Sequence, residues 1–203
     1  MNIIIKAIPI YNFLNYCNSS PLPKNVLDLG AGGKVPPLYI FNECGHKTYG
    51  IDFSDKAIDK ANKFCNEKSL NLNIHKGDMR KLNYNSEEFS FIYSYNSIFH
   101  MKKEEIKEVI HDVHRILKRE GLFFMNFLSK DDCRYGEGIK LSEGEFLQDE
   151  DDDKIIHSYF DDEECEKYFE GFKVIFKEKR ITEKYIECKK YKLSYIDYIL
   201  KKL

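Results

Sequence analysis

The strongest constraint on the fold is an alternation of strand-like and helix-like segments between residues 26 and 128. Short apolar runs typical of buried strands occur at 26–29, 48–53, 72–75, 89–95 and 122–128. Apolar residues recur at helical spacing over 10–17, 38–44, 55–67 and, most clearly, 104–118, where Gly121 is expected to end the helix. This order predicts an α/β fold, with a parallel sheet, helices on both faces and right-handed crossovers.

The pattern changes after residue 128. Residues 131–153 are polar, with acidic residues concentrated at 149–153, and predict a long loop or small hairpin beside the sheet. This excursion is either a solvated surface feature or a lid over the site. A short helix ending at Phe169 and strands over 171–181 and 191–200 follow, although 191–200 would also suit a helix. Because no linker interrupts the pattern, we expect residues 1–203 to form one domain, with 131–158 as an insertion or lid.

Composition excludes several classes of protein. The six cysteines are scattered without a C-x-x-C pair, so we expect free thiols, no cysteine-based metal site and a reducing, cytoplasmic location. No apolar run reaches the roughly 20 residues of a membrane-spanning helix, and residues 1–10 lack the features of a signal peptide. The net charge of −2 provides no basic field for nucleic acid.

Glycines and a carboxylate occur where open α/β sheets bind ligands, at the carboxyl ends of the strands. The turn Gly30-Ala31-Gly32-Gly33 follows the first strand, and Asp52 ends the second. A carboxylate there can accept hydrogen bonds from ribose hydroxyls. Asp52 could instead cap the next helix, but Ser54 is the better cap. Val35 replaces the last glycine of G-x-G-x-x-G and no Walker A motif occurs, so a nucleoside is favoured over a pyrophosphate ligand.

Taken together, the motifs resemble those of class I S-adenosylmethionine-dependent methyltransferases, in particular those similar to methyltransferase types 11 and 25. The resemblance covers roughly 24–200 and is carried by VLDLGAG at 26–32, YGIDFS at 49–54, KGDM at 76–79, FSFIYS at 89–94 and GLFF at 121–124. It implies a Rossmann-like sheet of about seven strands in the order 3-2-1-4-5-7-6, mostly parallel with an antiparallel last strand. This sequence departs from the family at Lys34, which takes the place of the last loop glycine, at Pro36-Pro37, and at Ser90, which replaces an acid.

The resemblance also implies which residues contact S-adenosyl-L-methionine. These are Asp28, Gly30, Ala31, Gly32, Asp52, Phe53, Asp78, Met79, Ser94 and Tyr95. The segment from Asp28 to Gly32 would line the methionine part, and Asp28 would hold the loop or reach the amino group through water. Asp52 would hold the ribose, Asp78 would accept from the adenine amine, and the Met79 amide would meet a ring nitrogen. Ser94 and Tyr95 would face the reacting centre.

Methyl transfer from a sulfonium requires few catalytic groups from the protein. The methyl group on a sulfonium is already activated, so the enzyme mainly holds a nucleophile in line in a dry site. A general base helps when the nucleophile carries a proton. Candidate bases and orienting groups are His100, His157, Tyr95 and Tyr11. His100 could instead pack under helix 104–118, and His157 could be an exposed strand residue.

Missing motifs narrow the acceptor. The sequence has no N-P-P-[YF] motif, no cytosine-C5 cysteine motif and no basic tract with interleaved aromatic residues. These absences favour a small-molecule acceptor. The alternatives are methyl transfer to protein or tRNA, binding of the cofactor without turnover, and an NAD-linked oxidoreductase, which Val35 and the Gly77-Asp78 motif argue against. The sequence indicates no oligomeric state.

Overall fold

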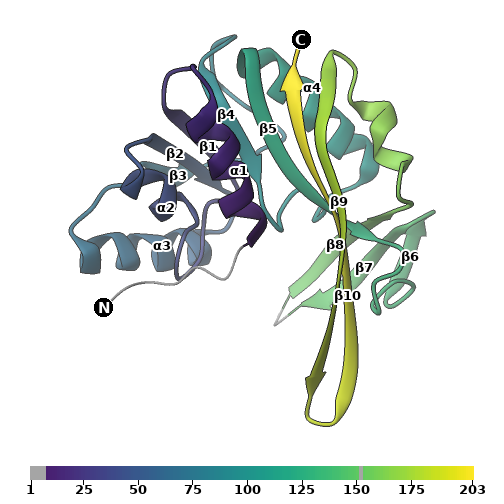
Figure 1. Cartoon of the computed structure of the whole chain (residues 1–203). Helices are drawn as coiled ribbons and strands as arrows, with labels where there is room; N and C mark the ends of the chain where they lie inside the picture. The colour runs from purple at the N-terminus through teal and green to yellow at the C-terminus, as the bar shows by residue number, and fades with distance from the viewer. Residues whose placement is uncertain (1–7, 151–152) are drawn as a thin grey trace.

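The computed structural model describes residues 8–150 and 153–203. Predictions about residues 1–7, and about Asp151 and Asp152 of the acidic cluster, therefore lie outside the described residues. Within the described part, a mixed sheet carries helices on both faces (Figure 1). No helix in this part of the chain is long and apolar enough to cross a membrane.

The predicted alternation of strands and helices is confirmed, with small shifts at the ends of elements. The strands are β1 (Asn25–Leu29), β2 (Lys47–Asp52), β3 (Ile74–Lys76), β4 (Phe89–Ser94) and β5 (Leu117–Ser129). The helices are α1 (Ile8–Ser19), α2 (Leu38–Glu43), α3 (Asp55–Lys68) and α4 (Lys103–Ile116). All neighbouring pairs in the order β3-β2-β1-β4-β5 are parallel, so their carboxyl ends share one edge of the sheet.

The boundary between α4 and β5 was predicted wrongly. The helix ends at Ile116 rather than before Gly121, and Leu117 already pairs with Phe89 of β4. The register then shifts, and Gly121 lies inside the irregularity, where an added Cβ would come within 2.7 Å of a backbone carbonyl oxygen. The apolar spacing continues from helix into strand because both elements bury their residues in the same core, so periodicity alone does not mark the junction.

The last two strands complete the predicted sheet order. β9 (Phe172–Ile186) and β10 (Lys189–Lys202) form a long hairpin that extends well beyond the sheet (Figure 1). β10 is antiparallel to both β5 and β9, which gives β3-β2-β1-β4-β5-β10-β9. This confirms the order 3-2-1-4-5-7-6, and it resolves 191–200 as a strand.

The segment predicted as a loop or small hairpin forms a hairpin, and the strand that follows extends it to a three-stranded antiparallel sheet, so the strand count exceeds the seven expected. It consists of β6 (Ile139–Ser142), β7 (Glu145–Glu150) and β8 (Asp153–Phe160). The end of β8 pairs in parallel with the end of β5, through Tyr159 and Phe160. A short 3-10 helix, η1 (Glu164–Tyr168), occupies the predicted helix before Phe169.

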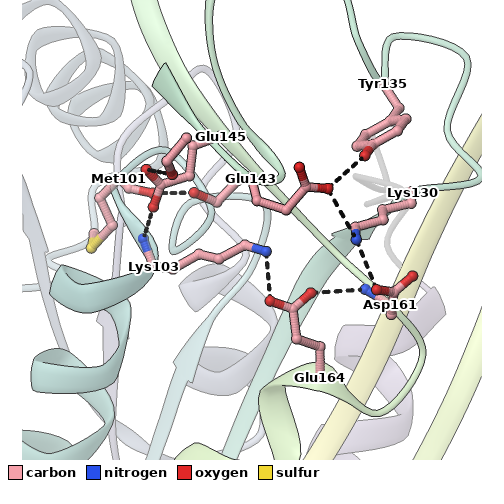
Figure 2. Close-up of polar contacts among 10 residues, drawn as sticks. Met101, Lys103, Lys130, Tyr135, Glu143, Glu145, Asp161 and Glu164 are labelled. Atoms are coloured by element: carbon pink, nitrogen blue, oxygen red, sulfur yellow. Dashed lines mark hydrogen bonds and ion pairs between the residues drawn. The ribbon is translucent and has the colours of Figure 1, made fainter. Parts of the chain in front are cut away.

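Polar contacts fix this small sheet against the start of α4 (Figure 2). The backbone N–H of Lys103 donates to Glu145 of β7 at 2.6 Å, and the Lys103 ammonium pairs with Glu164 of η1 at 2.6 Å. Lys130, just after β5, pairs with Asp161 at 2.7 Å. Because Lys103 and Glu145 are buried, these contacts hold β7 and β8 at a defined distance from the loop that follows β4.

Two apolar clusters cover the two faces of the sheet. One lies under α4, which buries the stripe predicted from its spacing, and it extends to η1. The other lies under α1 and α2, with Phe13 and Phe41 against Tyr93 of β4. The sheet is therefore covered on both faces, as the alternating pattern predicted, and its carboxyl-end edge is left for a ligand.

Candidate functional site

An open pocket of about 400 Å³ lies at the carboxyl ends of β1 to β4. It is lined by Gly30 after β1, by Ile51, Asp52, Phe53 and Ser54 at the end of β2, by Gly77, Asp78, Met79 and Arg80 after β3, by Ser97, His100 and Met101 after β4, and by Ile155 of β8. Sequence reasoning placed the first three groups at this edge. Ile155 of β8 falls within 131–158, the segment expected to form an insertion or lid, and it reaches the pocket because the small sheet folds over the loop after β4.

The glycine turn packs its backbone tightly against the neighbouring loops. Gly30 has φ +103°, and a Cβ there would lie 2.1 Å from the Ser97 hydroxyl oxygen. A Cβ on Gly32 would lie 2.6 Å from Asp52 Oδ2. The N–H groups of Gly30 and Ala31 both donate to the Ile51 carbonyl at 2.9 Å. The turn therefore needs glycine at both positions, while Ala31 is completely buried and lines the core rather than the pocket.

Asp52 links the turn to the pocket. Its Oδ2 accepts from the Gly32 N–H at 2.8 Å, and its Oδ1 accepts from the Ser54 N–H at 2.8 Å. Each carboxylate oxygen can accept a second hydrogen bond, so acceptor capacity remains on the pocket side. The N-cap of α3 is Ser54, whose hydroxyl accepts from the Ala57 N–H at 3.2 Å, so the alternative role of Asp52 as that cap is wrong.

Asp78 carries an arginine partner that the sequence analysis missed. Arg80 donates to the Asp78 carboxylate from Nε at 2.9 Å and from Nη2 at 2.7 Å, which lowers the pKa of Asp78. The guanidinium lies 5.8 Å from the centre of the Phe53 ring, and that ring is 66% exposed. A broad apolar surface with a carboxylate at its edge therefore forms one end of the pocket. The sequence signal was a basic residue two positions after Asp78.

Several residues predicted at the site line neither this pocket nor the second one. Asp28 is completely buried beside the Tyr93 hydroxyl, and burial raises the pKa of its carboxyl. Ser94 is completely buried, and its hydroxyl donates to a carbonyl oxygen of β1 at 2.9 Å. Tyr95 packs into the cluster under α1, and Tyr11 is 39% exposed on that helix. The Ser94 side chain therefore faces the sheet interior and that of Tyr95 the α1 face, and their placement at the reacting centre stays a prediction.

Lys34, which departs from the family loop, does not reach the pocket. Its side chain is exposed and lies beside Lys60 and Lys63 of α3, at a separate surface hollow. The Lys34 ammonium group therefore adds no positive charge to the side of the glycine turn that lines the pocket.

A second pocket of about 260 Å³ adjoins the first, and His100 lines both. Its other lining residues are Asn96, Phe99, Leu128, Asp132, Arg134, Glu150, His157, Tyr159, Leu193 and Tyr195. They come from the loop after β4, from β5, from the small sheet and from β10, so most of them could not be grouped from sequence spacing.

Two histidines meet in this second pocket. The His157 side chain is only 4% exposed, so its interpretation as an exposed strand residue is wrong. The His100 and His157 rings lie 4.7 Å apart between centroids, and His157 Nε2 lies 3.2 Å from Glu150 Oε2. Burial and the neighbouring His157 lower the pKa of His100 to about 4. His100 is therefore uncharged near neutral pH and presents a lone pair at the border between the pockets.

Comparison with known proteins agrees with this geometry. Residues 26–121 match a family model described as a methyltransferase domain. An S-adenosylmethionine-dependent methyltransferase of Methanosarcina mazei is 20% identical, with a TM-score of 0.72 over 93% of this chain and 97% of that chain. One from Clostridium acetobutylicum is 17% identical, with a TM-score of 0.71 over 97% of this chain and 92% of that one.

A third solved structure contains two bound molecules. The 1,6-didemethyltoxoflavin-N1-methyltransferase of Burkholderia thailandensis holds 1,6-didemethyltoxoflavin and S-adenosylhomocysteine. It is 14% identical, with a TM-score of 0.66 over 96% of this chain and 76% of that chain. None of the curated proteins compared with the sequence matches it significantly. Residues 26–121 therefore match a methyltransferase domain, and the chain has the fold of solved S-adenosylmethionine-dependent methyltransferases.

Proposed function

We propose that this protein transfers the methyl group of S-adenosylmethionine to a small-molecule acceptor that binds in the second pocket. The observation that carries the proposal is that His100 lines both pockets. A molecule in the second pocket would therefore lie next to a cofactor in the first pocket. A volume of about 260 Å³ suits a small ring system.

The residues of the first pocket fit S-adenosylmethionine by their chemistry. Asp52 keeps acceptor capacity for ribose hydroxyls, and Asp78 offers a carboxylate for an adenine amine. Ile51, Phe53 and Met79 supply apolar surface for the base. When bound, the cofactor supplies a methyl group activated by its sulfonium. These cofactor contacts, including those of Gly30 and the Met79 amide, are part of the proposal.

The second pocket favours a planar acceptor that carries an ionisable N–H or O–H. Phe99, Tyr159 and Tyr195 contribute aromatic surface, and Arg134 contributes a guanidinium that can pair with an anionic group. The lone pair of uncharged His100 can accept a hydrogen bond from the acceptor or hold a cation at the border. The Burkholderia methyltransferase, whose structure holds 1,6-didemethyltoxoflavin and S-adenosylhomocysteine, supports a small-molecule acceptor.

The charge of the pocket speaks against a nucleic-acid acceptor. Two carboxylates, Asp132 and Glu150, line it together with one arginine, so its surface is not predominantly positive. Methyl transfer to tRNA would need a basic surface beside the pocket to hold phosphates.

A variant that fills the second pocket tests the proposal. Leu193 of β10 lines only that pocket, so Leu193→Trp should leave S-adenosylhomocysteine affinity unchanged in calorimetry. It should lower transfer of a radiolabelled methyl group to a panel of aromatic hydroxyl and amine compounds by at least about tenfold. Leu141→Trp, at an exposed apolar position of β6, is the matched control. Equal turnover by Leu193→Trp and wild type, or transfer to tRNA or protein alone, would contradict the proposal.

A further inference from the structure

Three potential metal ligands converge in the second pocket. His100 comes from the loop after β4, Glu150 from the end of β7 and His157 from β8. Their ligand atoms all lie within 4.8 Å of one another. Glu150 Oε2 is 3.2 Å from His157 Nε2 and 4.0 Å from His100 Nδ1. His100 lies at least 50 residues before the other two, so only the folded small sheet brings it beside them.

These close approaches are not hydrogen bonds. Among the described residues, His100 Nδ1 and Glu150 Oε2 are buried atoms without a hydrogen-bond partner. His157 Nδ1 lies 3.3 Å from the Ile155 carbonyl oxygen, and the tautomer that donates this hydrogen bond leaves a lone pair on Nε2. His157 Nε2 then directs its lone pair toward the Glu150 carboxylate. Lone pairs that face each other in a buried site are unfavourable unless a cation lies between them.

The protein holds the two histidines rigidly. Ser158, next to His157, donates from its N–H to the Phe99 carbonyl at 2.9 Å and from its hydroxyl to the Met101 carbonyl at 2.7 Å. These two carbonyls flank His100 on either side. The arrangement therefore fixes the spacing of the imidazoles before any ligand arrives, as a metal site requires.

We propose that His100, Glu150 and His157 bind a divalent transition-metal ion, with Zn²⁺ the ion that suits two imidazoles and a carboxylate best. Bonds of about 2.0–2.2 Å in a tetrahedral site place ligand atoms about 3.3–3.6 Å apart, so the ligand atoms of this cluster, which lie within 4.8 Å of one another, would draw closer on metal binding. The contact of His157 Nδ1 with a backbone carbonyl is the usual way in which a metal-bound imidazole is oriented. The fourth position opens into the second pocket, which all three residues line.

This site rests on the proposed function and gives it a way to activate the acceptor. An oxygen, nitrogen or sulfur atom of the acceptor would complete the coordination. The charge of the ion lowers the pKa of the bound group. The acceptor's proton then leaves to solvent, and the bonding electron pair stays on the acceptor atom, which the ion holds beside the cofactor pocket.

Metal titrations of the full-length chain test the site directly. Protein stripped with a chelator should bind one equivalent of Zn²⁺ in calorimetry, and Co²⁺ should give the intense visible bands of a four- or five-coordinate ion. Glu150→Gln and His157→Asn should each weaken Zn²⁺ binding by at least about tenfold. His111→Gln, at an exposed histidine of α4, should bind Zn²⁺ as the wild type does.

Calorimetry with S-adenosylhomocysteine on the same preparations separates the metal site from the cofactor pocket and reports folding. Weakened Zn²⁺ binding with S-adenosylhomocysteine binding retained supports the proposal. Glu150→Gln keeps this test interpretable if His157→Asn fails to fold, because Glu150 lies at the partly exposed end of β7. A wild type that takes up neither Zn²⁺ nor Co²⁺, or a Glu150→Gln variant that binds Zn²⁺ as tightly as wild type, would overturn it. Failure of the wild type to bind S-adenosylhomocysteine would count against the proposed function and not against the metal site.

Discussion

Replacing Asp52 by asparagine tests how the glycine turn and the cofactor pocket depend on one carboxylate. Both oxygens accept a backbone N–H at 2.8 Å, from Gly32 and from Ser54. The asparagine amide would keep one acceptor oxygen and would place its NH₂ group against the other N–H donor. The Asp52→Asn variant therefore loses a charge-assisted hydrogen bond and sets two donors facing each other.

The size of the effect follows from that geometry. A hydrogen bond to a charged group contributes about 1.5–3 kcal/mol, and a ribose hydroxyl bound by the same carboxylate would weaken by a similar amount. We therefore expect the Kd for S-adenosylhomocysteine to rise about 10- to 100-fold. Because the carboxylate also holds the turn, the free energy of unfolding should fall by about 1–3 kcal/mol.

Isothermal titration calorimetry with S-adenosylhomocysteine measures the first effect, and urea unfolding measures the second. Asp55→Asn is the matched control, since Asp55 is exposed and pairs only with Lys76 at the surface. That variant should change the Kd by less than about twofold. An Asp52→Asn variant that binds S-adenosylhomocysteine as tightly as wild type would refute the assignment of Asp52 to the ribose.

Three further predictions concern stability. Gly30→Ala should lower the free energy of unfolding by more than about 2 kcal/mol, because φ is +103° and the new Cβ would overlap Ser97; urea unfolding measures this. Burial lowers the pKa of His46 to about 4, so as the pH falls this imidazole is protonated in the unfolded chain before it is protonated in the folded chain. His46 should therefore contribute a loss of about 2 kcal/mol of stability between about pH 7 and pH 5, and His46→Gln should lose about that much less than wild type in paired urea titrations. Lys103→Met should cost about 2–3 kcal/mol in denaturant unfolding, because it leaves Glu164 without its 2.6 Å partner.

The strands of the sheet and the glycine turn could be predicted because their requirements are local, whereas the strand order was implied by the resemblance to methyltransferases. The apolar stripe of α4 and the continuous apolar run of β4 each match one periodicity. The need for glycine at Gly30 follows from a backbone conformation that other residues avoid. The resemblance to methyltransferases then supplied the order of the last two strands.

The small sheet and the second pocket could not be predicted because they depend on distant contacts. All four residues of β6 are exposed, so no apolar pattern marks that strand. The position of His157 beside His100 depends on hydrogen bonds from Ser158 to the loop after β4. The packing of Tyr95 against the α1 cluster could not be predicted either, because the direction of a side chain at the end of a strand follows the pleat, which spacing along the chain does not determine.

A crystal structure of the chain with S-adenosylhomocysteine tests the central claim most directly. We expect the cofactor at the carboxyl ends of β1 to β4, with its ribose hydroxyls within hydrogen-bonding distance of Asp52 and its adenine beside Asp78 and Met79. Its sulfur should face the second pocket at His100. A cofactor bound at another edge of the sheet, or one whose sulfur points away from His100, would contradict the account.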